Sequence, residues 1–151
     1  MLNYAIDPAV LQPLVPVGTA LDEWQGQTFV SMVGFLWADT RVMGVPIPFH
    51  RTFEEVNLRF YVRRQGPDGW RRGVVFIKEL VPRWAVACVA RTVYGEHFAA
   101  VQMRHTVNAA PDPESGTRTV SYGWRFGQAD HELSIRVSGT PQVPAEGTAA
   151  R

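Results

Sequence analysis

The stretch FEEVNLRFYV, residues 53–62, alternates between apolar and polar side chains, as a β-strand with two different faces does. Its polar face consists of Glu55, Asn57, Arg59 and Tyr61, spaced about 6.6 to 7 Å apart along the strand. This face is either solvated or lines a cavity, and the alternation alone leaves both interpretations open. The fold of the rest of the chain decides between them.

Neighbouring segments extend this strand into a sheet. Residues 28–37 (TFVSMVGFLW) are apolar on both strand faces, which predicts a strand that is buried on both sides. Residues 73–80 (GVVFIKEL) predict a second partner, and the intervening Pro-Asp-Gly at 67–69 predicts a hairpin turn. Further strands are predicted at 97–107, 121–126 and 131–139, and one or two helical turns at 8–14.

One helix is predicted at 82–94 (PRWAVACVARTVY), with proline in its first turn and Gly95 at its end. Residues 84–90 are apolar all around the helical cylinder, so this helix should be enclosed. We therefore predict a mainly antiparallel α+β fold whose sheet closes, or nearly closes, around one buried helix. A single domain is expected over 1–139, followed by a flexible tail at 140–151.

Charge and composition exclude several classes of function. Fifteen Lys and Arg against 14 Asp and Glu give a formal charge of +1, which does not favour nucleic acid or anionic membranes as partners. Prolines interrupt the first residues where a signal peptide needs an apolar run, and no segment reaches the about 18 apolar residues of a membrane span. The single cysteine, Cys88, fits a reducing compartment, so a cytoplasmic protein is predicted.

No cofactor or metal is predicted, because the four histidines lack the short spacings of metal ligands and no phosphate-binding glycine loop is present. The densest charge is at the hairpin tip, where four arginines, 63, 64, 71 and 72, flank the turn. In a nearly neutral chain these arginines are more typical of a solvated hairpin than of a phosphate-binding patch.

The polar face of 53–62 has the groups needed to bind a small acid. Arg59 can hold a carboxylate in a two-pronged pair, Asn57 and Tyr61 can orient carbonyl or hydroxyl groups, and Glu55 can exchange a proton. Glu54 is expected on the opposite face unless a bulge near the start of the strand exchanges it with Glu55.

Lys78, the only lysine, is expected on the side of its strand that carries Val74, Phe76 and Leu80. A desolvated lysine is what imine chemistry on a ketone requires. The alternative is a lysine at a strand end whose ammonium group reaches water. Both interpretations stay open from the residues.

The segments DPAVLQPLVPVGTALDEWQGQTFVSMVGF, VPIPFHRTFEEVNLRFYVRR and GVVFIKELVPRWAVACVARTVYGEHFAAVQMRH resemble the YqjF-like family, a domain of unknown function in the acetoacetate decarboxylase-like superfamily. The resemblance covers about residues 3–139. It implies a cone-like, largely antiparallel β-barrel with a helix at its centre and a cavity inside.

The resemblance also implies where a site would lie. Glu55 takes the place of a glutamate that opens the corresponding strand in the decarboxylases. Their Schiff-base lysine and a second lysine follow the helix, where this chain has Tyr94-Gly-Glu96-His97. Without an amine at that place no imine forms, and Glu96 and His97 become candidates for polar lining and proton transfer.

The sequence therefore predicts a small-molecule-binding barrel for a small organic acid or carbonyl compound, with turnover of that compound left open. One alternative is a non-catalytic sensor or structural barrel, and another is decarboxylase or aldolase-type chemistry through Lys78. The chain looks shorter than the proteins of the family that it resembles. The resemblance implies a further strand before residue 1 and further strands after residue 151. An incomplete barrel exposes strand edges, which predicts pairing into a homo-oligomer.

Overall fold

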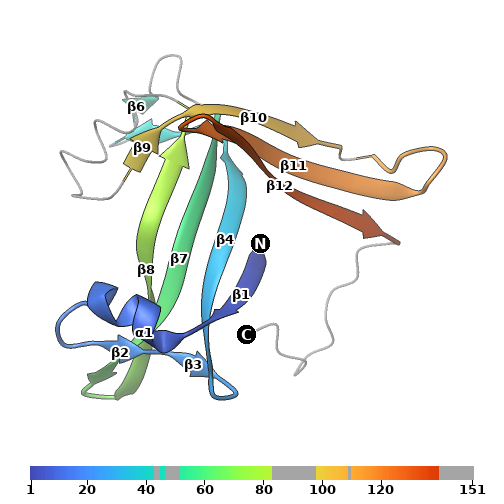
Figure 1. Cartoon of the computed structure of the whole chain (residues 1–151). Coiled ribbons are helices and arrows are strands. Elements are labelled where there is room, and N and C mark those ends of the chain that lie inside the picture. Colours follow the sequence, from blue (N-terminus) through green and yellow to red (C-terminus); the bar gives the residue numbers. More distant parts are fainter. Residues whose placement is uncertain (43–44, 47–51, 83–97, 109, 140–151) are drawn as a thin grey trace.

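The computed structural model describes residues 1–42, 45–46, 52–82, 98–108 and 110–139 (Figure 1). Within these residues nearly all regular structure is β-strand, as predicted, and each helix is about one turn long. Apart from Pro82, the helix predicted at 82–94 lies outside the described residues, and so does the tail predicted at 140–151.

The larger sheet has seven strands, and the strand predicted from residues 53–62 lies in its middle. Its main path is β1 (Leu2–Ile6), β4 (Gln27–Trp37), β7 (Phe53–Gly66), β8 (Gly69–Val81) and β9 (Phe98–Ala100). Two short strands, β2 (Ala20–Leu21) and β3 (Glu23–Trp24), pair with β7 and β4. All pairings are antiparallel except that of β8 with β9.

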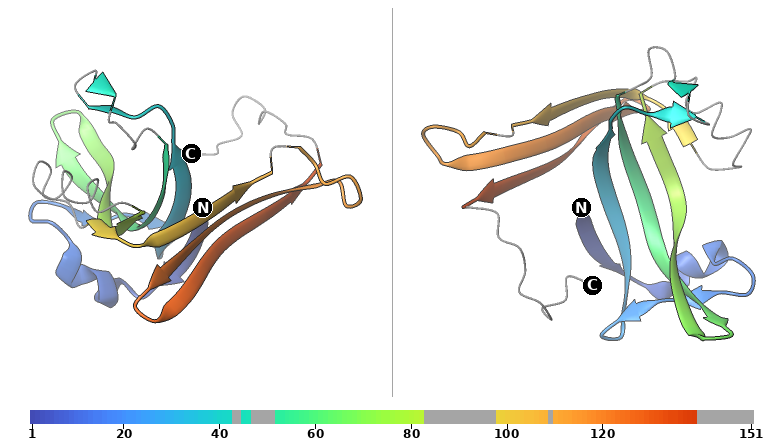
Figure 2. Two further views of the ribbon diagram at one scale, coloured as in Figure 1. Left: turned by 90° about the horizontal axis from the view of Figure 1, so that it is seen from above. Right: turned by 180° about the vertical axis from the view of Figure 1, so that it is seen from behind.

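A second sheet of three antiparallel strands crosses one end of the larger sheet (Figures 1 and 2). It consists of β10 (Gln102–Val107), β11 (Thr117–Phe126) and β12 (Ala129–Ser138). The segment predicted as one strand at 97–107 thus divides at Val101 between two sheets. A two-stranded pair, β5 (Arg41–Val42) and β6 (Val45–Pro46), completes the described strands. Because these strands form three sheets, closure into one barrel stays a prediction.

The β7–β8 hairpin has the predicted turn. Pro67 and Asp68 form the two-residue connection, and Gly69 follows with a φ of 114°, which glycine adopts without a steric penalty. Farther along the hairpin the register shifts, because Leu58 faces Lys78 whereas Arg59 faces Phe76. Ile77 is therefore an extra residue in β8, and the alternation of side chains reverses there.

A short helix covers one face of the larger sheet. In α1 (Pro8–Leu11), Asp7 caps the helix by accepting a hydrogen bond of 2.9 Å from the Ala9 N–H, and a 3₁₀ turn, η1 (Gln12–Leu14), follows. These are the helical turns predicted at 8–14. Leu11 packs against Phe60 and Val62 of β7, and Phe60 is 0% exposed. This apolar cluster anchors the centre of β7.

The same face of β7 contacts the three-stranded sheet nearer the start of the strand. Val56 and Leu80 pack there against Tyr122, Trp124 and Leu133. Beside this cluster, Glu54 lies 2.6 Å from His105 Nδ1, which joins β7 to β10. Glu54 therefore lies on the face opposite Glu55, as the uninterrupted alternation of β7 predicts. The bulge belongs to β8, where Ile77 is the extra residue, so it does not exchange Glu54 with Glu55.

Alkaline pH should weaken this contact between the sheets. Burial raises the pKa of the Tyr122 phenol above its ordinary value of 10.0, and the negative charge of Glu54 raises it further. The folded state therefore holds the phenol proton more tightly than the unfolded state does. The stabilisation is fully present below about pH 10 and is lost as the pH rises beyond it.

Urea unfolding at about pH 9 and about pH 11 measures this effect. We expect the free energy of unfolding to fall less between these pH values in Tyr122→Phe than in the unmodified protein. An equal fall in both proteins would contradict the prediction.

Candidate functional site

Glu55, Asn57, Arg59 and Tyr61, here called the polar row, point to the face of β7 opposite both α1 and the three-stranded sheet, since side chains alternate along a strand. Glu55 is 4% exposed and Asn57 is 2% exposed, and the other two are half-buried. The polar row is therefore not a solvated face. Burial of this many polar groups requires hydrogen bonds or ligands that satisfy them.

At one end of the polar row, two donors hold the Glu55 carboxylate. Trp37 of β4 donates from Nε1 to Oε2 at 2.8 Å, and Asn57 donates from Nδ2 to Oε1 at 3.1 Å. Ring contacts with Phe35 and Phe53 orient the Trp37 indole. Asn57 Oδ1 is buried without a hydrogen-bond partner among the described residues, so this acceptor is available to a donor.

Arg59, in the middle of the polar row, has a charge that the described residues do not neutralise. Its Nη2 lies 3.8 Å from Met1 Sδ, a weak acceptor, and its Nε is buried without a hydrogen-bond partner in the described part of the chain. No described carboxylate lies within ion-pair distance of it. A half-buried guanidinium of this kind favours an anion as its partner.

Tyr61 ends the polar row in a chain of hydroxyl groups. Ser31 of β4 is 0% exposed and donates to Asn3 Oδ1 at 2.6 Å, while Tyr61 OH lies 2.7 Å from Ser31 Oγ. Since Ser31 has one hydroxyl hydrogen, Tyr61 is the donor in the second bond. The oxygen of Tyr61 therefore keeps acceptor capacity for a ligand donor.

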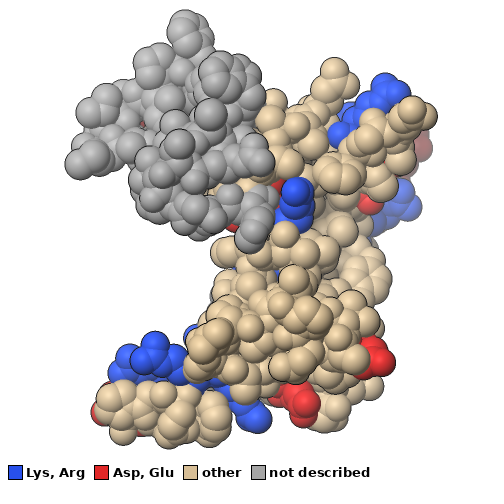
Figure 3. Space-filling model, turned by 60° about the vertical axis from the view of Figure 1, so that its left-hand side comes forward, with Lys and Arg blue, Asp and Glu red and all other residues tan. Residues whose placement is uncertain are grey.

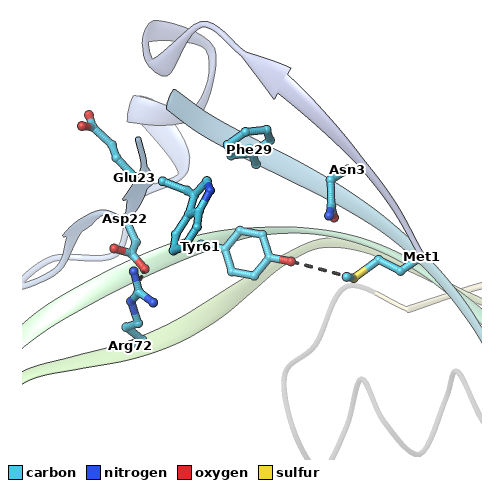
Figure 4. Close-up of a pocket in the computed structure, with 8 residues that line it drawn as sticks. Met1, Asn3, Asp22, Glu23, Phe29, Tyr61 and Arg72 are labelled. Carbon is cyan, nitrogen blue, oxygen red and sulfur yellow. Dashed lines mark hydrogen bonds and ion pairs between the residues drawn. The ribbon is translucent and has the colours of Figure 1, made fainter. Parts of the chain in front are cut away.

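A pocket of about 300 Å³ opens beside Tyr61 (Figure 4). We call it the Tyr61 pocket, and it is lined by Met1, Asn3, Trp24, Phe29, Tyr61, Glu23 and the ion pair of Asp22 with Arg72. In that pair, Arg72 Nε lies 2.8 Å from Asp22 Oδ2. Figure 4 shows the Tyr61 hydroxyl directed at Met1, whose sulfur also contacts Arg59. The pocket thus adjoins the polar row through Tyr61 and Met1.

Lys78 lies on the opposite face of the sheet from the polar row. The bulge at Ile77 places it beside Leu58 and Leu80, so the prediction that it shares a face with Val74 and Phe76 is wrong for those two residues. Lys78 is exposed, with no ion-pair or hydrogen-bond partner among the described residues. It borders a second pocket of about 230 Å³, the Lys78 slot, lined by Met32, Val56, Leu58, Lys78, Leu80, Trp124, Phe126 and His131.

Three of the four arginines at the hairpin tip interact with other side chains of the protein. Figure 3 shows basic side chains gathered at the lower end of the molecule, where Figure 1 places the β7–β8 turn. Arg63 lies over the Trp70 ring at 4.8 Å, Arg71 pairs with Asp68 at 3.1 Å, and Arg72 pairs with Asp22. Such internal partners fit a solvated hairpin.

Two of the predicted site residues, Glu96 and His97, lie outside the described residues. Within the described ranges, no group of three or more His, Cys, Asp or Glu side chains is arranged to hold a metal ion. In the same ranges, no helix has the length and apolar character needed to cross a membrane.

The sequence prediction missed the partners of the polar row, namely Trp37 and Ser31 of β4, Asn3 of β1, and Met1, which precedes β1. One local signal was present, because Ser31 is a hydroxyl residue inside an otherwise apolar strand. Its cross-strand position opposite Arg59 comes only from the register of β4 on β7.

Comparison with known proteins identifies the family. All residues, 1–151, match the model of DUF2071, a family described as an uncharacterized conserved protein. The chain belongs to the DUF2071 family. A relative of this DUF2071 chain is the uncharacterized protein YqjF of Bacillus subtilis (strain 168), which is 38% identical over 68 residues. These two matches confirm the resemblance to YqjF-like proteins that the sequence predicted. The aligned segment makes up 44% of this DUF2071 chain and 28% of YqjF.

A solved structure has a similar fold. The acetoacetate decarboxylase of Legionella pneumophila subsp. pneumophila str. Philadelphia 1 matches with a TM-score of 0.56 at 17% identity. The match covers 85% of this DUF2071 chain and 42% of the decarboxylase. The likeness therefore concerns the fold. The match covers less than half of YqjF and less than half of the decarboxylase.

Proposed function

We propose that the polar row binds a small organic acid or carbonyl compound, with Arg59 holding the carboxylate of the acid. The observation that carries this proposal is the half-buried Arg59 guanidinium, which has no carboxylate partner in the described part of the chain. Leaving a charge partly desolvated and unpaired is costly, and an anionic ligand removes that cost.

The neighbours of Arg59 support the same ligand class. On one side, the Tyr61 hydroxyl oxygen can accept a hydrogen bond from a hydroxyl group of the ligand, and on the other Asn57 Oδ1 can accept one. The Tyr61 pocket, with Trp24 and Phe29 in its walls, offers room for the body of the ligand. The similarity in fold to the acetoacetate decarboxylase supports the expectation that the sheet closes around the row.

Turnover, if the ligand is a substrate, would use proton transfer rather than an imine. Glu55 is the candidate for proton transfer among the described residues. Glu96 and His97 are candidates that rest on the sequence. Chemistry through Lys78 has less support, because Lys78 is exposed and faces away from the polar row, whereas an imine-forming lysine is desolvated.

A non-catalytic sensor or structural domain is the second candidate function. It is favoured by the hydrogen bonds that the polar row makes to protein groups, with Glu55 held by Trp37 and Asn57, and Tyr61 by Ser31. In a purely structural domain these bonds would be complete without a ligand.

Arg59→Met tests the proposal, because it keeps an apolar stem and removes the charge. A panel of small carboxylates and their neutral amides is titrated by calorimetry. We expect an acid in the panel to bind, and its affinity to fall about 10-fold to 100-fold in the variant, as loss of a charged hydrogen bond predicts.

Arg64→Met is the matched control, since Arg64 is exposed at the hairpin tip and should leave the affinity unchanged. Equal affinity in Arg59→Met and the unmodified protein would refute the role of Arg59. Failure of every carboxylate to bind would favour the structural function.

A further inference from the structure

The Lys78 slot lies between the two sheets, and its lining is almost entirely apolar. Val56, Leu58 and Leu80 form its wall on the larger sheet, and Trp124 and Phe126 form its wall on β11. His131 stacks on Trp124 at a ring distance of 5.6 Å and an angle of 16°, so its ring extends the same wall. A small apolar body that enters the slot meets side chains from both sheets.

Lys78 gives this apolar slot a single fixed charge. No Asp or Glu is among the residues that line it, and the structure gives Lys78 no ion-pair partner among the described residues. An anionic group is therefore complementary in charge, and the exposed position of Lys78 lets that group remain partly hydrated. A small anion without an apolar part would leave the walls of the slot wet.

We propose that the Lys78 slot is a second binding site, for a small monocarboxylate with an apolar body of the size of benzoate or hexanoate. The carboxylate pairs with Lys78, and the body packs against Leu58 and Trp124. The volume of about 230 Å³ corresponds to about eight water molecules at about 30 Å³ each, which suits a ligand of this size.

The second site is independent of the polar row. Leu58 and Arg59 are neighbours in β7 and point to opposite faces of the sheet. A ligand in the Lys78 slot therefore contacts none of the polar row, and variants on one face should leave the other site unchanged.

The only lysine in the chain provides a specific readout. With ¹³C-labelled lysine the protein gives one set of lysine side-chain signals, all from Lys78. We expect benzoate and hexanoate to shift the Lys78 ε-methylene signal in a saturable manner. Benzyl alcohol and hexanol, which lack the charge, should bind more weakly and shift it less. Signals that do not move with either acid would overturn the proposal.

Calorimetric titration of Lys78→Met complements the spectra. We expect benzoate affinity to fall about twofold to fivefold, the range for an ion pair at an exposed site. Arg59→Met and the surface control Arg64→Met should keep this affinity.

Three results would overturn the second site. The first is equal benzoate affinity in Lys78→Met and the unmodified protein, and the second is loss of benzoate binding in Arg59→Met alone. The third is a dimer, detected by sedimentation, in which the acids do not bind to the slot. Because Arg59→Met changes the polar row and not the Lys78 slot, failure of one proposed site and failure of the other change the affinities of different variants.

Discussion

Replacement of Phe60 by alanine should lower the free energy of unfolding by about 3 to 5 kcal/mol, the range for removing a fully buried phenyl ring. Phe60 is 0% exposed and packs with Leu11 and Val62, with Val30, Val75 and Ile77 around them. Alanine removes the ring and leaves a cavity, because strands β4 and β8 are held in place by their backbone pairing on both sides of β7. Urea unfolding followed by fluorescence measures the loss.

Phe126→Ala is the matched control for this prediction. Phe126 is 49% exposed, so the same change should cost less than about 1 kcal/mol. Phe60→Leu keeps most of the volume and should cost less than about 1.5 kcal/mol. Equal losses in the free energy of unfolding for Phe60→Ala and Phe126→Ala would contradict the packing of α1 on β7.

Gly34→Ala should lower the free energy of unfolding by about 1 to 3 kcal/mol through overpacking. A Cβ atom at Gly34 would lie 2.6 Å from Tyr122 Cδ2, 3.0 Å from Cγ and 3.1 Å from Leu133 Cδ2. Tyr122 and Leu133 belong to the buried cluster between the two sheets and have little room to move. The absence of a side chain at residue 34 thus permits the close approach of the three-stranded sheet to β4.

Gly73→Ala is the control, because a Cβ there would meet only Val62 Cγ2, at an ordinary contact distance of 3.8 Å. It should leave the free energy of unfolding unchanged or raise it slightly, since alanine restricts the unfolded chain. Thermal unfolding of the two variants side by side distinguishes a steric effect from a general effect of losing glycine. Equal stabilities in the two variants would contradict the close sheet contact.

The two faces of β7 carry different kinds of side chains, and one proposed binding site lies on each face. One face carries the polar row, where Arg59 lacks a described carboxylate partner, and the other carries the apolar contacts that end at Lys78. The proposed sites for acids differ accordingly. The polar row offers several hydrogen-bonding groups to a small polar ligand, whereas the Lys78 slot offers one charge and apolar walls.

The sequence alone determined the strand of residues 53–62, the hairpin at Pro67 and Asp68, and the helical turns after Asp7, because each depends on residues close together in the chain. It also identified the family, since the motifs around EVNLRFYV resemble the YqjF-like proteins. Local alternation predicted which side chains share a face of β7, and the structure has the same grouping.

Only the tertiary structure decided what covers each face. The burial of Glu55 and Asn57, and the pairing of Tyr61 with Ser31, depend on contacts between residues far apart in sequence. The position of Lys78 depends on the bulge at Ile77, which adds one residue and reverses the alternation without any local sequence signal. Strand period is a local property of the backbone, whereas burial and register arise from packing between distant segments, and this packing places Arg59 and Lys78 on opposite faces of one sheet.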